Sequence, residues 1–252
     1  MSTPLVLVAH GSRDPRSARA MAAAAAAVRG ARPDLDVRLC FLDLSAPSVD
    51  QVVDAVAAEG HSSAVVVPLL LGSAFHARVD LPALLAAGRA RNPGLDLVQA
   101  DVLGDDERLV AAVRDRVRAT GVTLDDAEIG VVLAAVGSSC AAANARTANI
   151  APRLLAGTAW SGAETCFATT APSLPQTVFR LRAGGARRIV VAPWFLAPGL
   201  LTDRLKLQAT EHAPDALFAD AIGAHPLLAE VALDRYRGGL ELLSDTRIEL
   251  SA

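Results

Sequence analysis

The sequence is poor in cysteine and in aromatic residues, and it lacks any long apolar segment. Its three cysteines, Cys40, Cys140 and Cys166, stand far apart without a C-x-x-C pair, which argues against redox and thiolate–metal chemistry. Aromatic residues make up 4% of the chain and the net charge is -3, unlike the basic, aromatic surface of nucleic-acid-binding proteins. The longest apolar runs, 20–28 and 64–71, are far shorter than the ~20 residues of a membrane helix. We therefore expect neither nucleic acid nor a membrane as a partner.

The N-terminus also lacks a basic leader and a cleavage pattern, because its first apolar run ends in polar residues. We therefore expect no signal peptide and a cytoplasmic protein. The chain has 252 residues, of which 52% are hydrophobic and 20% charged, and this suits one large or two small globular domains. Cys40 and Cys166 fall within expected strands, where cysteine behaves as a small buried hydrophobe.

Short apolar runs that alternate with helical patterns predict an α/β fold with parallel sheets covered on both faces. In the first half, the expected strands are 5–9, 37–41, 64–69 and 95–100, and the expected helices are 17–29, 48–59, 78–91 and 105–120. A polar stretch, 121–126, follows, and the pattern then begins again. We expect two similar domains, 1–124 and 125–252, each a parallel four-stranded sheet flanked by helices.

An internal repeat supports two similar halves. Three short segments recur at offsets of 126, 125 and 125 residues: Ala9-His10-Gly11-Ser12 as Ala135-Val136-Gly137-Ser138, Ala46-Pro47-Ser48 as Ala171-Pro172-Ser173, and Val66-Val67-Pro68 as Val191-Ala192-Pro193. We expect the halves to be related by a pseudo-twofold axis with a cleft between them.

Histidines follow two of the expected strands. His10 comes directly after strand 5–9, and His76 follows strand 64–69 after a short turn. In open α/β sheets, ligands bind at the carboxyl ends of the strands, and neutral imidazole is a good ligand for divalent iron, cobalt, nickel and zinc. Asp43 is the natural carboxylate for the same site, although it would also suit the N-terminus of the next helix.

The second half of the repeat lacks these polar groups. The aligned pairs are His10 with Val136, His76 with Leu201, and Asp43 with Ala168. If folding required the polar groups, the second half would carry them too. We therefore expect one functional site, in the first half. The remaining histidines, His61, His212 and His225, are expected to be solvent-exposed bystanders.

Other polar residues near the strand ends are candidate substrate contacts. They are Ser12, Arg13, Gly72, Ser73 and Arg78, with Arg16 beside them. Arginine pairs with carboxylates through two parallel hydrogen bonds, but turns and helix starts use the same residue types. In the second half, Trp194 either covers a flat ligand or belongs to the core.

The chain resembles the class II tetrapyrrole chelatases, in particular the sirohydrochlorin chelatases of siroheme and cobalamin synthesis. The matching segments are His10-Gly11-Ser12-Arg13-Asp14-Pro15, Phe41-Leu42-Asp43-Leu44, Ala46-Pro47-Ser48, Val67-Pro68-Leu69-Leu70-Leu71 and His76-x-x-x-Asp80-Leu81-Pro82. The resemblance covers nearly the whole chain, including a degenerate second half. The resemblance implies two α/β domains with the tetrapyrrole between them. It also implies that His10 and His76 bind the metal and accept pyrrole protons. Asp43 stands where many members have Glu.

The implied activity is that of a lyase that inserts a divalent metal ion into sirohydrochlorin, an acidic tetrapyrrole. We expect Fe²⁺ first and Co²⁺ second, each as a substrate, and no organic cofactor. Because one chain supplies both walls of the expected cleft, it can act as a monomer or as a homodimer.

Two other interpretations stay open from the sequence. The chain could be a non-catalytic carrier of metal or tetrapyrrole, since His10 and His76 suit both roles. It could also be related to the histidine phosphatases, which have His-Gly after a first strand. Those enzymes carry Arg directly before the His, where this chain has Ala9, so this interpretation is the weaker one.

Overall fold

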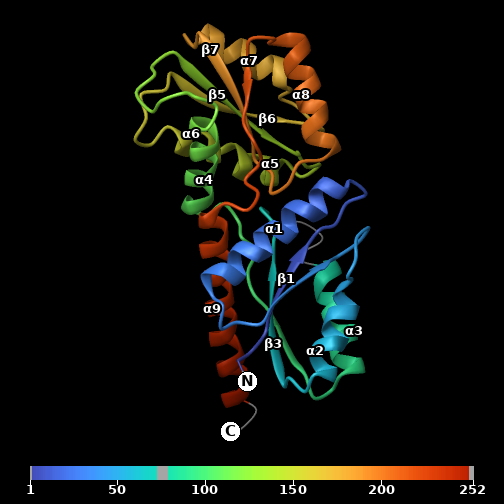
Figure 1. Cartoon of the computed structure of the whole chain (residues 1–252). Helices are drawn as coiled ribbons and strands as arrows, with labels where there is room; N and C mark the ends of the chain where they lie inside the picture. Colours follow the sequence, from blue (N-terminus) through green and yellow to red (C-terminus); the bar gives the residue numbers. More distant parts are fainter. Residues whose placement is uncertain (1, 73–78, 250–252) are drawn as a thin grey trace. The chain divides into compact units, whose positions relative to one another are not determined.

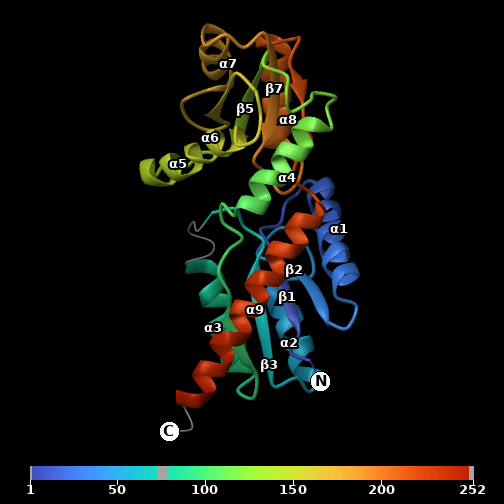
Figure 2. The same cartoon turned by 90° about the vertical axis from the view of Figure 1, so that its left-hand side faces the viewer.

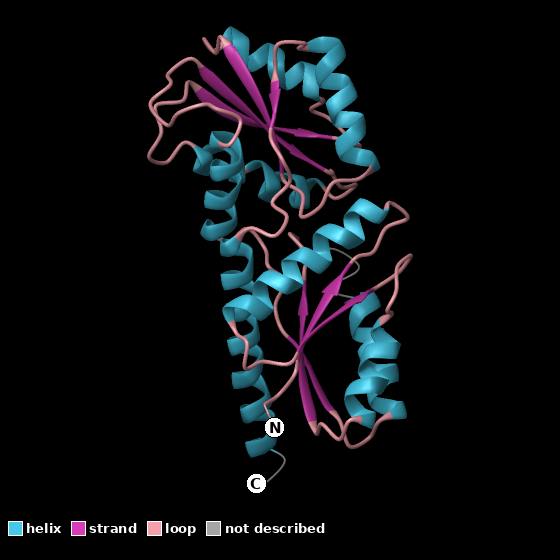
Figure 3. Cartoon of the chain, viewed as in Figure 1, coloured by secondary structure: helices cyan, strands magenta, loops and turns pink. Residues whose placement is uncertain are grey.

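The structure is a computed structural model that describes residues 2–72 and 79–249. The chain divides into two compact units: Met1–Gly104 together with Ala224–Ala252, and Asp105–Gly223. Each unit is a β-sheet with helices on both faces (Figures 1 and 3). The expected α/β class and the two four-stranded parallel sheets are thereby confirmed.

The first unit contains a parallel sheet with the strand order β2-β1-β3-β4. Its elements are β1 (Leu5–Ala9), α1 (Pro15–Ala31), β2 (Val37–Phe41), α2 (Val49–Ala58), β3 (Ser63–Pro68), α3 (Leu81–Arg91), β4 (Asp96–Gln99) and α9 (Pro226–Glu249). Helices α2 and α3 cover one face, and α1 and α9 cover the other (Figure 1). Since both faces are covered, the central strands β1 and β3 read as nearly continuous apolar runs, whereas the edge strands β2 and β4 also contain Arg38, Asp96 and Gln99.

The second unit repeats this strand order as β6-β5-β7-β8. Its elements are α4 (Glu107–Arg118), β5 (Ile129–Ala135), α5 (Ala141–Ala148), α6 (Ile150–Leu154), β6 (Gly162–Phe167), α7 (Leu174–Ala183), β7 (Arg188–Pro193), α8 (Leu200–His212) and β8 (Leu217–Phe218). The identical order supports the internal repeat found in the sequence.

The units do not divide at the boundary expected from the sequence, between residues 124 and 125. The last helix, α9, packs on β3 of the first sheet (Figure 2). There Tyr236 Oη donates a 2.6 Å hydrogen bond to the carbonyl oxygen of Thr3, and Arg235 donates to the carbonyls of Val102 and Leu103.

Conversely, α4 packs within the second unit, although it directly follows the first sheet in sequence. Arg114 donates hydrogen bonds to the carbonyl oxygens of Leu154 and Arg153, and Arg116 donates to that of Ile222. The sequence locates an amphipathic helix, but the periodicity of its apolar face does not say which sheet that face covers.

The fold resolves what the sequence left to be tested for Cys40, Cys166 and Trp194, and for membrane-spanning segments. Cys40 and Cys166 are fully buried in strands, as expected, and burial raises the pKa of each thiol to about 12. Trp194 is 5% exposed, which supports a core role over a ligand-covering one. Among the described residues, no helix is both long and apolar enough to cross a membrane.

Candidate functional site

His10 lies exposed at the carboxyl end of β1, next to the end of β2. The carbonyl oxygen of His10 accepts a 3.1 Å hydrogen bond from the amide of Asp43, which is also exposed. Gly11 follows with φ +94°, and a Cβ on it would lie 1.7 Å from the carbonyl oxygen of Asp43. Only glycine allows both this backbone angle and this approach. The two strand ends are therefore held in contact through their backbones.

The loop after β2 turns sharply at Leu44. The amide of Ser45 donates a 2.7 Å hydrogen bond to the carbonyl oxygen of Asp43, and Leu44 between them has φ +58°. This is a γ-turn of the strained, positive-φ kind. The amide of Leu44 also donates a 2.7 Å hydrogen bond to Oδ1 of Asp43. The Asp43 carboxylate is thus fixed against its own loop.

Ser12 connects the loop after β1 to the loop after β2. Its amide donates a 3.2 Å hydrogen bond to Oγ of Ser45, and the Ser45 hydroxyl donates a 3.0 Å hydrogen bond to the Ser12 carbonyl oxygen. The Ser12 hydroxyl in turn accepts a hydrogen bond from the amide of Asp14, the N-cap residue of α1. Ser12 therefore organises the turn, whatever contact it makes with a substrate.

The two arginines near the start of α1 have different surroundings. Arg16 pairs with Asp14 at 2.5 Å, and its side-chain hydrogen bond is the main cause that lowers the pKa of the Asp14 carboxyl. Arg16 therefore serves the helix start. Arg13 is exposed and forms no ion pair with any described residue. Of this pair, Arg13 is the better candidate for a substrate carboxylate.

The third strand end is described only in part. Gly72 is exposed beyond the end of β3. The candidate residues Ser73, His76 and Arg78 lie outside the described residues, so their roles stay predictions.

The second unit corrects one aligned pair. The amide of Thr169 donates to the carbonyl oxygen of Val136 at 3.0 Å, as Asp43 does to His10. Asp43 therefore corresponds to Thr169, whereas the sequence alignment paired it with Ala168. The repeat loses one residue after this point, and sequence identity alone did not locate the gap. The second half still lacks both the imidazole and the carboxylate.

The CbiX family model matches residues 4–120 and 130–238. The chain belongs to the CbiX family. The first matched segment of this CbiX protein contains β1 to β4, and the second contains β5 to β8 except for Ile129.

Named relatives of this CbiX protein cover most of its length. A sirohydrochlorin cobaltochelatase of Priestia megaterium is 28% identical, over 94% of this chain and 80% of the relative. A sirohydrochlorin ferrochelatase of the same organism is 29% identical, over 90% of this chain and 86% of the relative. The solved structure of SirB from Bacillus subtilis with Fe³⁺ is 27% identical and superimposes with a TM-score of 0.77, covering 94% and 95% of the two chains.

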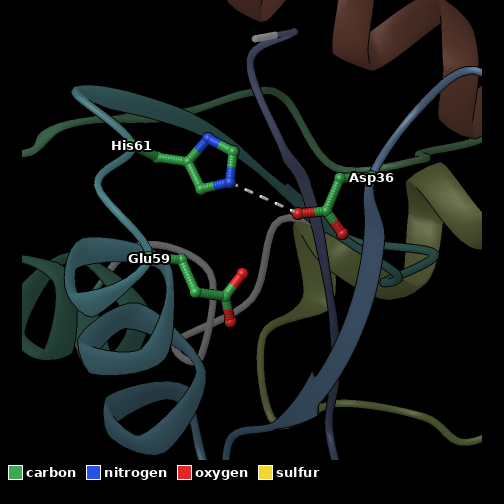
Figure 4. A group of neighbouring side chains, drawn as sticks. All are labelled: Asp36, Glu59 and His61. Atoms are coloured by element: carbon green, nitrogen blue, oxygen red, sulfur yellow. Dashed lines mark ion pairs between the residues drawn. The ribbon is translucent and has the colours of Figure 1, made fainter.

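A second cluster of metal-binding residue types lies at the amino ends of the strands of the first sheet, opposite to the end where His10 lies. Asp36 precedes β2, and Glu59 and His61 lie between α2 and β3; their ligand atoms are within 4.8 Å of one another (Figure 4). Arg38 donates hydrogen bonds to Glu59 and to Asp36. These bonds raise the pKa of its guanidinium, and the bond to Glu59 has the larger effect. Because this one cation already donates hydrogen bonds to both carboxylates, we interpret the cluster as a salt-bridge network.

His61 itself differs from the sequence expectation. Its side chain is only 11% exposed and its Nε2 lies 3.7 Å from Oδ2 of Asp36, so it is no solvent-exposed bystander. Sequence reasoning also missed Ser45. The one signal that pointed to it was the change of repeat offset from 126 to 125 between the segments that begin at Ala9 and at Ala46.

Proposed function

We propose that this protein inserts a divalent metal ion, Fe²⁺ or Co²⁺, into sirohydrochlorin. One observation supports this most: in a CbiX-family chain, an exposed imidazole and an exposed carboxylate follow adjacent strands, and one backbone hydrogen bond joins His10 to Asp43. The relatives named as cobaltochelatase and ferrochelatase support the substrate and both metals. Fe²⁺ is our preferred physiological metal.

The reaction requires proton transfer as well as metal transfer. A metal ion that enters the macrocycle displaces the two pyrrole N–H protons, so an acceptor must be present at the macrocycle. A neutral imidazole both binds a divalent ion and accepts a proton. We assign His10 to both tasks, with His76 as the second ligand and proton acceptor.

The remaining candidates supply charge and orientation. Asp43 provides negative charge next to His10, which attracts the metal cation. Sirohydrochlorin is rich in carboxylates, and Arg13 provides a planar guanidinium that pairs with a carboxylate through two hydrogen bonds. We assign substrate contacts to Ser12, Arg13 and Gly72, with Ser73 and Arg78.

The test is anaerobic insertion of Fe²⁺ and Co²⁺ into sirohydrochlorin, followed by visible absorption. We expect wild-type protein to accelerate insertion of both metals over the uncatalysed rate. His10→Ala should lower that rate about a hundredfold or more, because it removes a ligand and a general base together. Circular dichroism checks that the variant is folded.

His61→Ala is the matched control, because it removes a mostly buried histidine of the same unit that precedes β3, at the amino ends of the strands. We expect it to insert metal at the wild-type rate. Equal losses in His10→Ala and His61→Ala would contradict the assignment of the site. Wild-type protein that binds sirohydrochlorin or metal without accelerating insertion would be a carrier.

A further inference from the structure

The loop after β2 in the first unit contains a residue that its counterpart lacks. The amide of Phe41 donates to the carbonyl oxygen of Pro47, and in the same way Phe167 donates to Pro172. Asp43 is equivalent to Thr169. Three residues lie between Asp43 and Pro47 in the first unit, but only two lie between Thr169 and Pro172 in the second. The extra residue therefore belongs to the stretch 44–46, which contains the strained turn.

The extra residue allows a turn that the shorter loop does not show. Leu44 has φ +58°, a backbone angle that side chains with a Cβ rarely adopt. It is the only residue other than glycine with positive φ among the described parts of the chain. Strained backbone of this kind persists only where surrounding contacts hold it, and it gathers at functional sites.

The contacts that hold this turn come from the other loop. In the first unit, the side chain of Ser45 accepts a hydrogen bond from the amide of Ser12 at 3.2 Å and donates one to its carbonyl at 3.0 Å. In the second unit, Asn144 makes the same pair of bonds to Ser138, both at 2.8 Å. In each unit, the loop after the first strand in sequence, β1 or β5, is the first loop. It is fixed by one side chain that bonds both the N–H and the carbonyl of its serine, Ser12 or Ser138.

The origin of that side chain differs between the units. Asn144 belongs to α5, the helix that follows its own loop, so it ties that loop only to itself. Ser45 belongs to the loop after β2, so it ties the loop of His10 to the loop of Asp43. Among the described residues, a side chain from the second loop therefore bonds both the N–H and the carbonyl of the first loop's serine only in the unit that carries the imidazole and the carboxylate. In the second unit the side chain that links the two loops is that of Thr169, whose Oγ1 donates a 2.8 Å hydrogen bond to the carbonyl oxygen of Val136 and leaves the serine to Asn144.

We propose that Ser45 is a positioning residue for the metal-handling pair. Its hydroxyl, placed by the turn at Leu44, fixes the loop of His10 relative to that of Asp43, so that imidazole and carboxylate act on one metal ion. The inference rests on the proposed function for the identity of that ion. Residues that orient metal ligands typically change metal affinity 10–100-fold when they are lost.

The experiment compares Ser45→Ala, Ser45→Thr and Ser45→Val in the full-length protein. Thr and Val have nearly the same shape, but only Thr retains the hydroxyl. Two quantities are measured: the Co²⁺ dissociation constant, from visible absorption without tetrapyrrole, and the hydrogen-exchange protection of the Ser12 amide, by NMR. We expect Ser45→Ala and Ser45→Val to lose Ser12 protection and to bind Co²⁺ about tenfold more weakly. Ser45→Thr should behave like wild type.

Asn144→Ala is the matched control, because it removes the equivalent pair of bonds in the second unit. We expect it to expose the Ser138 amide to exchange and to leave Co²⁺ affinity unchanged. Unchanged Co²⁺ affinity in Ser45→Ala, despite loss of Ser12 protection, would overturn the positioning role, as would an equal loss of affinity in Asn144→Ala.

The same measurements separate this inference from the proposed function. If wild-type protein fails to insert metal while its Co²⁺ affinity still depends on the Ser45 hydroxyl, the chelatase function is wrong and the positioning role stands. If wild-type protein inserts metal and Ser45→Val does so with unchanged affinity and rate, the function stands and the positioning role is wrong.

Discussion

A Cβ atom on Gly11 would lie 1.7 Å from the carbonyl oxygen of Asp43. No side chain fits at that distance, and the neighbouring atom belongs to the backbone, so the loops would have to separate. The contact makes Gly11 a steric condition for holding His10 beside Asp43. Its effect is distinct from that of the positive φ angle alone, and the chain allows the two effects to be separated.

Gly11→Ala should therefore destabilise the protein by about 3 kcal/mol, from backbone strain together with displacement of the loop. It should also abolish metal insertion. Gly121→Ala is the control, because Gly121 has the same φ of +94° with no atom within 4 Å of a Cβ. We expect it to cost about 1 kcal/mol and to preserve insertion. Urea unfolding and the insertion assay measure both effects, and equal losses of stability would contradict the steric explanation.

Two adjacent glycines in α9 predict opposite effects on stability. A Cβ on Gly239 would lie 2.3 Å from Cγ1 of Val65, a buried β-branched residue of β3 with little rotamer freedom. A Cβ on Gly238 meets no atom within 4 Å. We expect Gly239→Ala to destabilise by about 2 kcal/mol through overpacking. Gly238→Ala should stabilise by up to about 1 kcal/mol through helix propensity.

Chemical unfolding of the two α9 variants, followed by circular dichroism, tests this pair. Destabilisation by Gly238→Ala, or tolerance of Gly239→Ala, would show that α9 does not pack on β3 as described. The test therefore also checks the assignment of the last helix to the first unit.

We expect the ionisation of Tyr236 to lower the stability of the folded protein in alkali. Burial is the main cause that raises its pKa above the ordinary value of 10, and its hydroxyl donates to the carbonyl oxygen of Thr3. The unfolded phenol ionises first as pH rises, so the unfolded state binds fewer protons in that range. The contribution of Tyr236 to stability should be complete below about pH 10 and should disappear as pH rises through the raised pKa.

Tyr236→Phe removes both the hydrogen bond and the ionisation. We expect it to be about 1 kcal/mol less stable than wild type at pH 8 and to have a flatter pH dependence above pH 10. Tyr236 is the only tyrosine of the chain, so tyrosinate absorbance reports its pKa directly. A wild-type titration midpoint at or below 10 would contradict the prediction.

Much of the fold follows from local sequence patterns. The strands Leu5–Ala9 and Val37–Phe41 have the bounds that the sequence predicts, and the other strands and helices of the first half lie within a few residues of the expected ranges. Apolar runs, helix periods and caps are properties of neighbouring residues, so a single sequence contains them. The position of His10 at a strand end follows from the same patterns.

Tertiary structure decided which sheet each helix covers and how the two loops meet. Helices α4 and α9 belong to the units opposite to those that their places in the sequence suggested, because an apolar helix face does not encode its partner. The sequence likewise gave Ser45 no special character. Its role arises because folding brings it to Ser12, 33 residues away, and contacts across that distance depend on the packing of whole strands and not on local pattern.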